Sequence, residues 1–186
     1  MDAALRTTGL DPELFRDRSP HGLSMGERRR VALAGILALE PRVLILDEPG
    51  AGLDPDGRVR LMGLLARWVG AARADTAAGD AGMLEYSPVG GARTSAECGG
   101  GRTLVFTSHD MDEVAELAQR VVLMAGGAIL AEGPADRILG DEQLLSRAGL
   151  RPPLAARVAG RLGASGSRPV TAGALADWLR ARERVA

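Results

Sequence analysis

Apolar and polar residues follow one another along this chain in patterns that predict helices separated by short strands. Residues 24–40 have a helical pattern whose last ten positions are nearly all apolar, so we expect a deeply buried helix. Residues 43–46 (VLIL) are an unbroken apolar run, typical of a strand that is covered on both faces. Residues 103–107 (TLVFT) predict a second buried strand. This alternation of helices and strands is typical of an α/β sheet protein.

The other patterned segments predict further helices and one hairpin. Residues 58–68 form an amphipathic helix whose inward side chains are Val59, Leu61, Met62, Leu64 and Leu65. Shorter helices are expected at residues 2–7, 110–120 and 154–162, and after a capping Thr171, where Trp178 and Leu179 can dock the last helix. A hairpin is expected over residues 121–132, with its turn at Gly126-Gly127.

Composition changes this interpretation at one segment. Residues 70–102 are rich in Gly, Ala, Ser and Thr and poor in large apolar side chains, so we expect a flexible surface insertion there. The full length of 186 residues suits one domain, with or without a small appendage. Cys98 is the single cysteine, which excludes a disulfide framework and favours a cytoplasmic location. A net charge of -1 argues against an obligate nucleic-acid partner.

Two adjacent carboxylates, Asp47 and Glu48, end the apolar strand at residues 43–46. The carboxyl ends of parallel strands face the ligand crevice of an α/β sheet. Adjacent residues of an extended strand point in opposite directions, so one carboxylate can hold a hydrated Mg²⁺ while the other faces an attacking water. The alternative is a pair of solvated acids with no chemical role.

The start of the helix at residues 24–40 has the features of an anion site. Ser24 supplies a hydroxyl and Gly26 leaves the backbone open, and free N–H groups at a helix start attract negative charge. The competing interpretation is an ordinary capping box between Ser24 and Glu27. His109 follows the second strand and precedes another helix, and it is either a catalytic or a structural histidine.

Together, these segments resemble the ATPase subunit of an ABC transporter. LSMGE at 23–27 resembles the signature motif, and VLILDEP at 43–49 resembles the Walker B strand. AGLDPD at 51–56 is similar to the D-loop, and VFTSHD at 105–110 to the segment with the switch histidine. The segment at 17–41 resembles more narrowly the energy-coupling-factor, cobalt-type importers of metals and vitamins.

This resemblance implies a fold and a domain organisation. Residues 1–140 would be the carboxyl-terminal part of a P-loop NTPase domain of the ABC type, with parallel core strands and part of the helical subdomain. Residues 141–186 would be a short helical extension. The segment at 121–132 would be the hairpin that closes the ATPase domain.

The resemblance also implies roles for individual residues. Ser24 and Gly26 would contact the γ-phosphate of an ATP that the opposite subunit holds. Asp47 would bind Mg²⁺ through water, and Glu48 would polarise the attacking water. Asp54 would couple the two sites across a dimer. His109 would hold the γ-phosphate and the attacking water in line.

ATP and Mg²⁺ are therefore the expected cofactors. The expected partners are a second ABC ATPase subunit and integral membrane transporter subunits, without nucleic acid. The resemblance places the chain peripherally on the cytoplasmic face of the cell membrane. It implies that the whole protein powers an importer of the cobalt, nickel or vitamin type.

The sequence departs from this family at several points. Met25 replaces a glycine of the signature motif, and Glu27 replaces its glutamine. All 23 basic residues are arginine, so the P-loop pattern G-x-x-x-x-G-K-[ST] is absent, and so is a glutamine upstream of the signature. We therefore expect the isolated chain to hydrolyse no ATP and several apolar faces to lie open.

Three explanations of the missing P-loop stay open. The chain can be the carboxyl half of a longer importer ATPase. It can instead be a natural half-subunit that supplies the signature motif to a partner ATPase without hydrolysing ATP alone. The third explanation is a non-enzymatic remnant kept for interaction.

Overall fold

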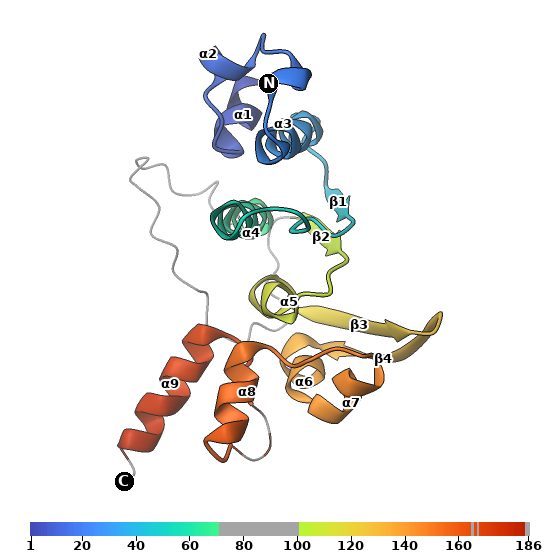
Figure 1. The fold of residues 1–186 in the computed structure, drawn as a ribbon, viewed down its shortest axis with the longest axis vertical. Helices are drawn as coiled ribbons and strands as arrows, with labels where there is room; N and C mark the ends of the chain where they lie inside the picture. The colour runs from blue at the N-terminus through green and yellow to red at the C-terminus, as the bar shows by residue number, and fades with distance from the viewer. Residues whose placement is uncertain (71–100, 165, 167, 185–186) are drawn as a thin grey trace. The chain divides into compact units, whose positions relative to one another are not determined.

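The computed structural model describes residues 1–70, 101–164, 166 and 168–184. These residues fall into two compact units, divided between Thr107 and Ser108 (Figure 1). Most of the insertion expected at 70–102, including Cys98, lies outside the described residues.

The first unit consists of helices around a small parallel sheet. Its helix α1 packs on α3 (Figure 1). Ala4 and Leu5 of α1, Ala34 of α3 and Leu10 of the segment after α1 form one buried cluster. The strands pair in parallel with Val43 opposite Thr103 and Leu46 opposite Phe106. The elements are α1 (Asp2–Thr7), α2 (Pro12–Phe15), the 3₁₀ turn η1 (Pro20–Gly22), α3 (Met25–Leu37), β1 (Val43–Leu46), α4 (Pro55–Gly70) and β2 (Thr103–Phe106).

One face of the β1–β2 sheet is open, which corrects the expectation of two covered faces. Leu44 is buried, whereas its neighbours Val43 and Ile45 are 55% and 74% exposed. Val105, paired with Ile45, is 49% exposed on β2. Side chains alternate across a strand, so Leu44 packs inward while these three form an apolar face in contact with water. The expectation of open apolar faces is confirmed.

The helices of this unit bury one side each. In α3 the residues Leu33, Ala34 and Leu37 are buried, but Ile36 is 43% exposed, so the expected deep burial on all sides was wrong. The inward face of α4 is as predicted, except that Val59 is 57% exposed, since it precedes the buried stretch that begins at Leu61. The buried residues of α4 are Leu61, Met62, Gly63, Leu64, Leu65 and Trp68.

In its described residues, the second unit contains the predicted hairpin and five helices. Strands β3 and β4 pair antiparallel, and helix α6 packs against both of them. Their turn has Gly126 and Gly127 at φ 57° and 77°, backbone angles that favour glycine. Helices α6 and α7 were not predicted. The elements are α5 (Met111–Leu117), β3 (Arg120–Ala125), β4 (Ala128–Pro134), α6 (Ala135–Gly140), α7 (Glu142–Arg147), α8 (Leu154–Arg161) and α9 (Ala172–Glu183).

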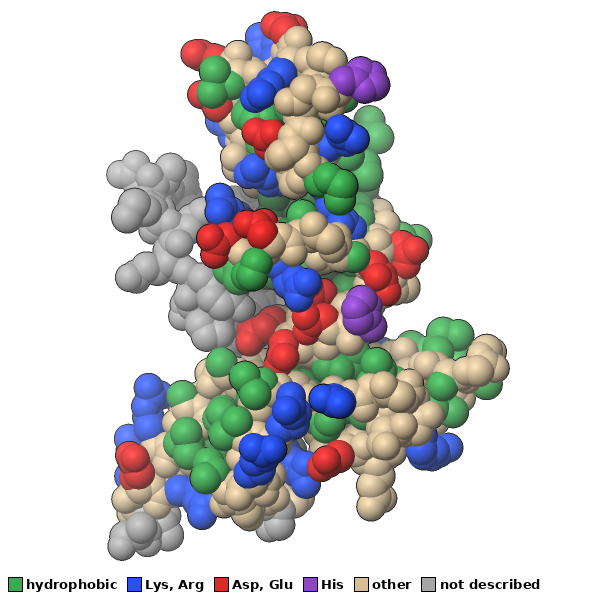
Figure 2. All heavy atoms as spheres, viewed as in Figure 1, with side chains coloured by type: hydrophobic (Ala, Val, Ile, Leu, Met, Phe, Trp, Pro, Cys, Tyr) green, Lys and Arg blue, Asp and Glu red, His purple; other side chains and the backbone are tan. Residues whose placement is uncertain are grey.

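The last two helices pack on each other, and arginine side chains gather over them (Figure 2). Thr171 caps α9 as predicted, accepting a hydrogen bond of 3.2 Å from the Ala174 N–H. Trp178 lies under the Arg182 guanidinium, 4.7 Å from the ring centre, and is only half-buried. Within the described part of the chain, no helix is both long and apolar enough to cross a bilayer.

Candidate functional site

The parallel register places Thr107 beside Asp47 at the carboxyl end of the sheet. Leu46 pairs with Phe106, so the residues that follow them are neighbours. The Thr107 hydroxyl donates to Asp47 Oδ1 at 2.5 Å and accepts from the Glu48 N–H at 3.0 Å. One hydroxyl therefore holds both residues of the predicted carboxylate pair, from the neighbouring strand.

Asp47 and Glu48 are both exposed to solvent. Among the described residues, no group of three or more His, Cys, Asp or Glu side chains is placed to hold a metal ion together. Asp47 Oδ2 receives no hydrogen bond from the described part of the chain. An exposed carboxylate with one oxygen open to solvent fits a hydrated Mg²⁺ that it contacts through water, as magnesium usually keeps several waters.

The backbone of Glu48 is strained. Its φ of 41° lies in the left-handed region, which costs a non-glycine residue about 1–2 kcal/mol. Such angles persist where the surroundings hold them, and they cluster at functional sites. Here the Glu48 N–H is held by Thr107, and the Glu48 carbonyl accepts a hydrogen bond of 2.6 Å from Arg29 Nη2.

The start of α3 forms a complete capping box. The Ser24 hydroxyl accepts from the Glu27 N–H at 3.2 Å, and the Glu27 carboxylate accepts from the Ser24 N–H at 2.8 Å. The pKa of the Glu27 carboxyl is lowered, first by the hydrogen bond from the Ser24 N–H and then by the interaction of the carboxylate with the Ser24 hydroxyl, with help from the charges of Arg18 and Arg30.

This box does not use every polar group at the helix start. The N–H groups of Met25 and Gly26 belong to the first turn, which offers them no intrahelical acceptor. The Ser24 hydroxyl, which also interacts with the Glu27 carboxylate, lies at the same helix start. The local geometry therefore fits both the capping box and the predicted phosphate contact, which are compatible with each other.

The loop after β1 lies against the start of α3. A Cβ added to Gly26 would be 3.9 Å from Leu53 Cδ2, and one added to Gly52 would be 3.7 Å from Met25 Cε. Arg29 Nη1 also donates to the Ala51 carbonyl at 2.5 Å. The signature-like and D-loop-like segments, well separated in sequence, are therefore in contact.

Asp54 caps helix α4 in this structure. Its Oδ1 accepts from the Gly57 N–H at 3.2 Å, and Pro55 occupies the first helical position, where its missing N–H costs nothing. A Cβ on Gly57 would lie 2.4 Å from Asp54 Oδ1, so a side chain at position 57 would disrupt this contact. Asp54 therefore has a structural role as a helix cap, in addition to the predicted role at the dimer interface.

His109 belongs to the second unit, where side-chain hydrogen bonds hold its loop on both sides. The buried Glu113 carboxylate accepts from the Ser108 hydroxyl at 2.9 Å, and the Ser108 oxygen accepts from the Asp110 N–H at 3.0 Å. Asp110 in turn caps α5, accepting from the N–H groups of Asp112 and Glu113. His109 itself is exposed at the centre of this loop.

Comparison with known proteins agrees with these motifs. A family model described as ABC transporter matches residues 1–51. The chain is 43% identical over 159 residues to an energy-coupling factor transporter ATP-binding protein of Symbiobacterium thermophilum, covering 86% of this chain and 45% of that protein. It is 42% identical over 155 residues to a cobalt import ATP-binding protein of Rhodobacter capsulatus, covering 83% of this chain and 44% of that protein.

A solved structure shows the same relationship. The cbiO1 protein of Clostridium perfringens, described as part of the ABC transporter complex cbiONQ, superposes with a TM-score of 0.53 at 30% identity. The match covers 86% of this chain and 51% of that one. This chain is a relative of ABC-transporter ATPases. It spans about half the length of the curated relatives it matches.

As an ABC ATPase relative, the chain has the fold expected from its motifs, that of part of a P-loop NTPase domain of the ABC type. The first unit brings together Ser24, Gly26, Asp47, Glu48 and Asp54 around the loop after β1, and His109 lies in the second unit. Two residues at this loop, Arg29 and Thr107, were not predicted as site residues. Thr107 could have been found by pairing residues 43–46 in parallel with 103–106, which places it beside Asp47. Arg29 could not, because it binds backbone carbonyls, which every residue type has.

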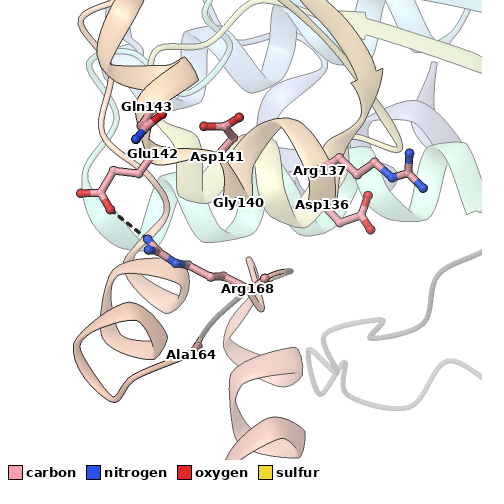
Figure 3. A pocket seen from close by; sticks show the side chains of 9 residues that line it. Asp136, Arg137, Gly140, Asp141, Glu142, Gln143, Ala164 and Arg168 are labelled. Atoms are coloured by element: carbon pink, nitrogen blue, oxygen red, sulfur yellow. Dashed lines mark hydrogen bonds and ion pairs between the residues drawn. The ribbon is translucent and has the colours of Figure 1, made fainter.

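A surface hollow in the second unit lies away from every predicted site residue of that unit. It is lined by residues of α6 and α7 and by Arg168, whose guanidinium donates to Glu142 at 2.9 Å (Figure 3). Its lining includes three carboxylates and two guanidinium groups, so it contains charged groups of both signs.

Proposed function

We propose that this chain is part of an ATP-binding and ATP-hydrolysing subunit that powers an ABC importer of the cobalt, nickel or vitamin uptake type. The observation that carries the proposal is the meeting of three motif segments at the loop after β1. Arg29 of the signature-like helix donates hydrogen bonds to the carbonyls of Glu48 and Ala51. The start of the same helix, at Met25 and Gly26, lies against the D-loop-like segment at 51–56. Relatives named as cobalt and nickel import ATP-binding proteins, 42% and 41% identical, support the transport class.

In this proposal the two carboxylates have different tasks. Glu48 polarises the attacking water, and its strained backbone fixes the direction of its side chain. Asp47 holds the waters around Mg²⁺, with the Thr107 hydroxyl fixing its orientation through Oδ1. Bound Mg²⁺ supplies charge stabilisation to the phosphate oxygens.

The remaining site residues act on the phosphates and across the subunit boundary. Ser24 and Gly26 donate to the γ-phosphate of an ATP held by a second subunit, through a hydroxyl and free helix-start N–H groups. His109 aligns the γ-phosphate with the attacking water. Asp54 couples the two sites of the ATPase dimer.

The proposed surroundings follow from this class of protein. The subunit pairs with a second ABC ATPase subunit and docks on integral membrane transporter subunits. It lies peripherally on the cytoplasmic face of the cell membrane. A lysine-containing P-loop, which the 186 residues lack, is provided by sequence upstream of Met1.

The DNA upstream of Met1 tests where the P-loop comes from. The proposal predicts an in-frame G-x-x-x-x-G-K-[ST], followed by a glutamine loop, with no intervening stop codon. Stop codons directly upstream of Met1 would contradict it. Two explanations would then remain: a half-subunit that supplies its signature motif to a partner ATPase, or a non-enzymatic remnant kept for interaction.

A further inference from the structure

The side chain of Arg29 joins the signature-like helix to the loop that carries Glu48. Arg29 lies in the second turn of α3 and is half-buried. Its Nη2 donates to the Glu48 carbonyl at 2.6 Å, and its Nη1 donates to the Ala51 carbonyl at 2.5 Å. A planar guanidinium holds two acceptors in a fixed relative position, which a single-point cation does not.

The first of these two hydrogen bonds involves Glu48, the residue of the site with a strained backbone. The Glu48 backbone, with its φ of 41°, is held by Thr107 at the β2 end on the N–H and by Arg29 of α3 on the carbonyl. The same carbonyl also accepts a hydrogen bond of 3.1 Å from the Ala51 N–H within the loop, so Arg29 is the contact that ties this carbonyl to α3. Loss of the Thr107 or the Arg29 contact would weaken this hold and favour relaxation of the backbone toward negative φ. The direction of the Cα–Cβ bond, and with it the Glu48 carboxylate, would then change.

Neighbouring arginines of α3 do not share this geometry. Arg28 is exposed and donates to the Leu23 carbonyl of its own helix start at 3.4 Å. Arg30 donates to the Gly9 carbonyl, also at 3.4 Å. Within the described part of the chain, Arg29 is therefore the arginine of this run that reaches the loop after β1.

We propose that Arg29 is a positioning residue that fixes the Glu48 backbone and the following loop relative to the start of α3. The catalytic meaning of this role rests on the proposed function of Glu48, whereas the structural link does not. Because Ser24 and Gly26 begin the same helix, a phosphate bound there would influence Glu48 through Arg29.

Amide hydrogen exchange on the full 186-residue chain tests the link without ATP. Four proteins are compared by mass spectrometry: wild type, Arg29→Ala, Arg29→Lys and the charge-matched control Arg28→Ala. Arg29→Ala should speed exchange about tenfold in peptides covering residues 48–53, because two charge-assisted hydrogen bonds are lost. Arg29→Lys should give an intermediate rate, since one ammonium cannot hold both carbonyls in the guanidinium geometry.

The pattern along the chain separates positioning from general stabilisation. Peptides from α1 and α4, and the whole Arg28→Ala protein, should exchange as in wild type. Uniformly faster exchange in Arg29→Ala would overturn the proposal and leave Arg29 a structural residue. Unchanged exchange at 48–53, or an equal effect of Arg28→Ala, would overturn it as well.

A kinetic test on the complete ATPase addresses the catalytic consequence separately. Arg29→Ala should lower kcat about tenfold or more with KM for ATP unchanged, because it misplaces Glu48 without removing a nucleotide contact. A raised KM with unchanged kcat would refute the positioning role. A complete wild-type subunit that hydrolyses no ATP would refute the proposed function, while the exchange result would still decide the structural link.

Discussion

Replacing Thr107 with valine tests the geometry at the end of the sheet. Valine keeps the shape of the side chain but removes the donor to Asp47 and the acceptor for the Glu48 N–H. A hydrogen bond to a charged group contributes about 1.5–3 kcal/mol, and a neutral one about 0.5–1.5 kcal/mol. Asp47 and Glu48 are both exposed, so water replaces part of these hydrogen bonds in the variant. We therefore expect Thr107→Val to lower the free energy of unfolding by about 1–2 kcal/mol.

For a chain of this length the loss corresponds to a Tm lower by roughly 2–8 °C. The assay is thermal unfolding followed by tryptophan fluorescence in a Trp178→Phe background, so that the buried Trp68 reports on the first unit. Thr103→Val on the same strand is the matched control, because no hydrogen bond of its side chain occurs among the described residues. Thr107→Ser should retain most of the wild-type stability.

A double-mutant cycle isolates the contact with Asp47. The cycle of Asp47→Ala with Thr107→Val should show a coupling free energy of about 1 kcal/mol, as expected for residues that share a hydrogen bond. Equal Tm values for Thr107→Val and Thr103→Val, together with zero coupling, would refute the proposed role of the Thr107 hydroxyl.

Three further substitutions test the helices of the first unit. In urea titrations, Ser24→Ala should lower the free energy of unfolding by about 1 kcal/mol through loss of the cap. Ser19→Ala is the control, because it removes no capping hydrogen bond, and it should change this free energy by under about 0.5 kcal/mol. Leu65→Ala should cost about 3–5 kcal/mol because Leu65 is 0% exposed, while Leu39→Ala at 81% exposure should be nearly neutral in the same assay. Glu27 has a lowered pKa when folded, so its stabilisation is complete above its ordinary pKa of 4.5 and is lost as pH falls through the folded value. The Tm difference between wild type and Glu27→Gln should therefore be largest near neutral pH and vanish in acid, and a difference that grows in acid would contradict the pKa direction.

Local sequence signals predicted most of the elements. Val43–Leu46 forms the strand expected from its apolar run, and Asp2–Thr7 the expected helix. The capping box at Ser24 and the paired glycines at 126 and 127 were also readable, because each depends on residues close together in sequence. Helices α6 and α7 have only six residues each, too short for an apolar period to stand out.

Burial was predicted less well, for a physical reason. The apolar runs of α3 and β1 indicate surfaces that favour contact, but they do not say whether a covering element lies within the same 186 residues. Ile36 and Ile45 are exposed here although their patterns predicted burial. The site residues of the first unit were identified from motifs, whereas Arg29 was not, since its partners are backbone carbonyls.

The central claim is that Glu48 activates water in an importer ATPase, and phosphate release tests it most directly. The measurement compares wild type, Glu48→Gln and the control Glu40→Gln in the subunit completed by its P-loop segment. Glu40 is a suitable control because it also has a positive φ, 50°, at the end of the helical region. We expect Glu48→Gln to lower turnover about 100-fold or more while ATP still binds. Glu40→Gln should have wild-type turnover, and the isolated 186-residue chain should show none. Wild-type turnover by Glu48→Gln would contradict the claim.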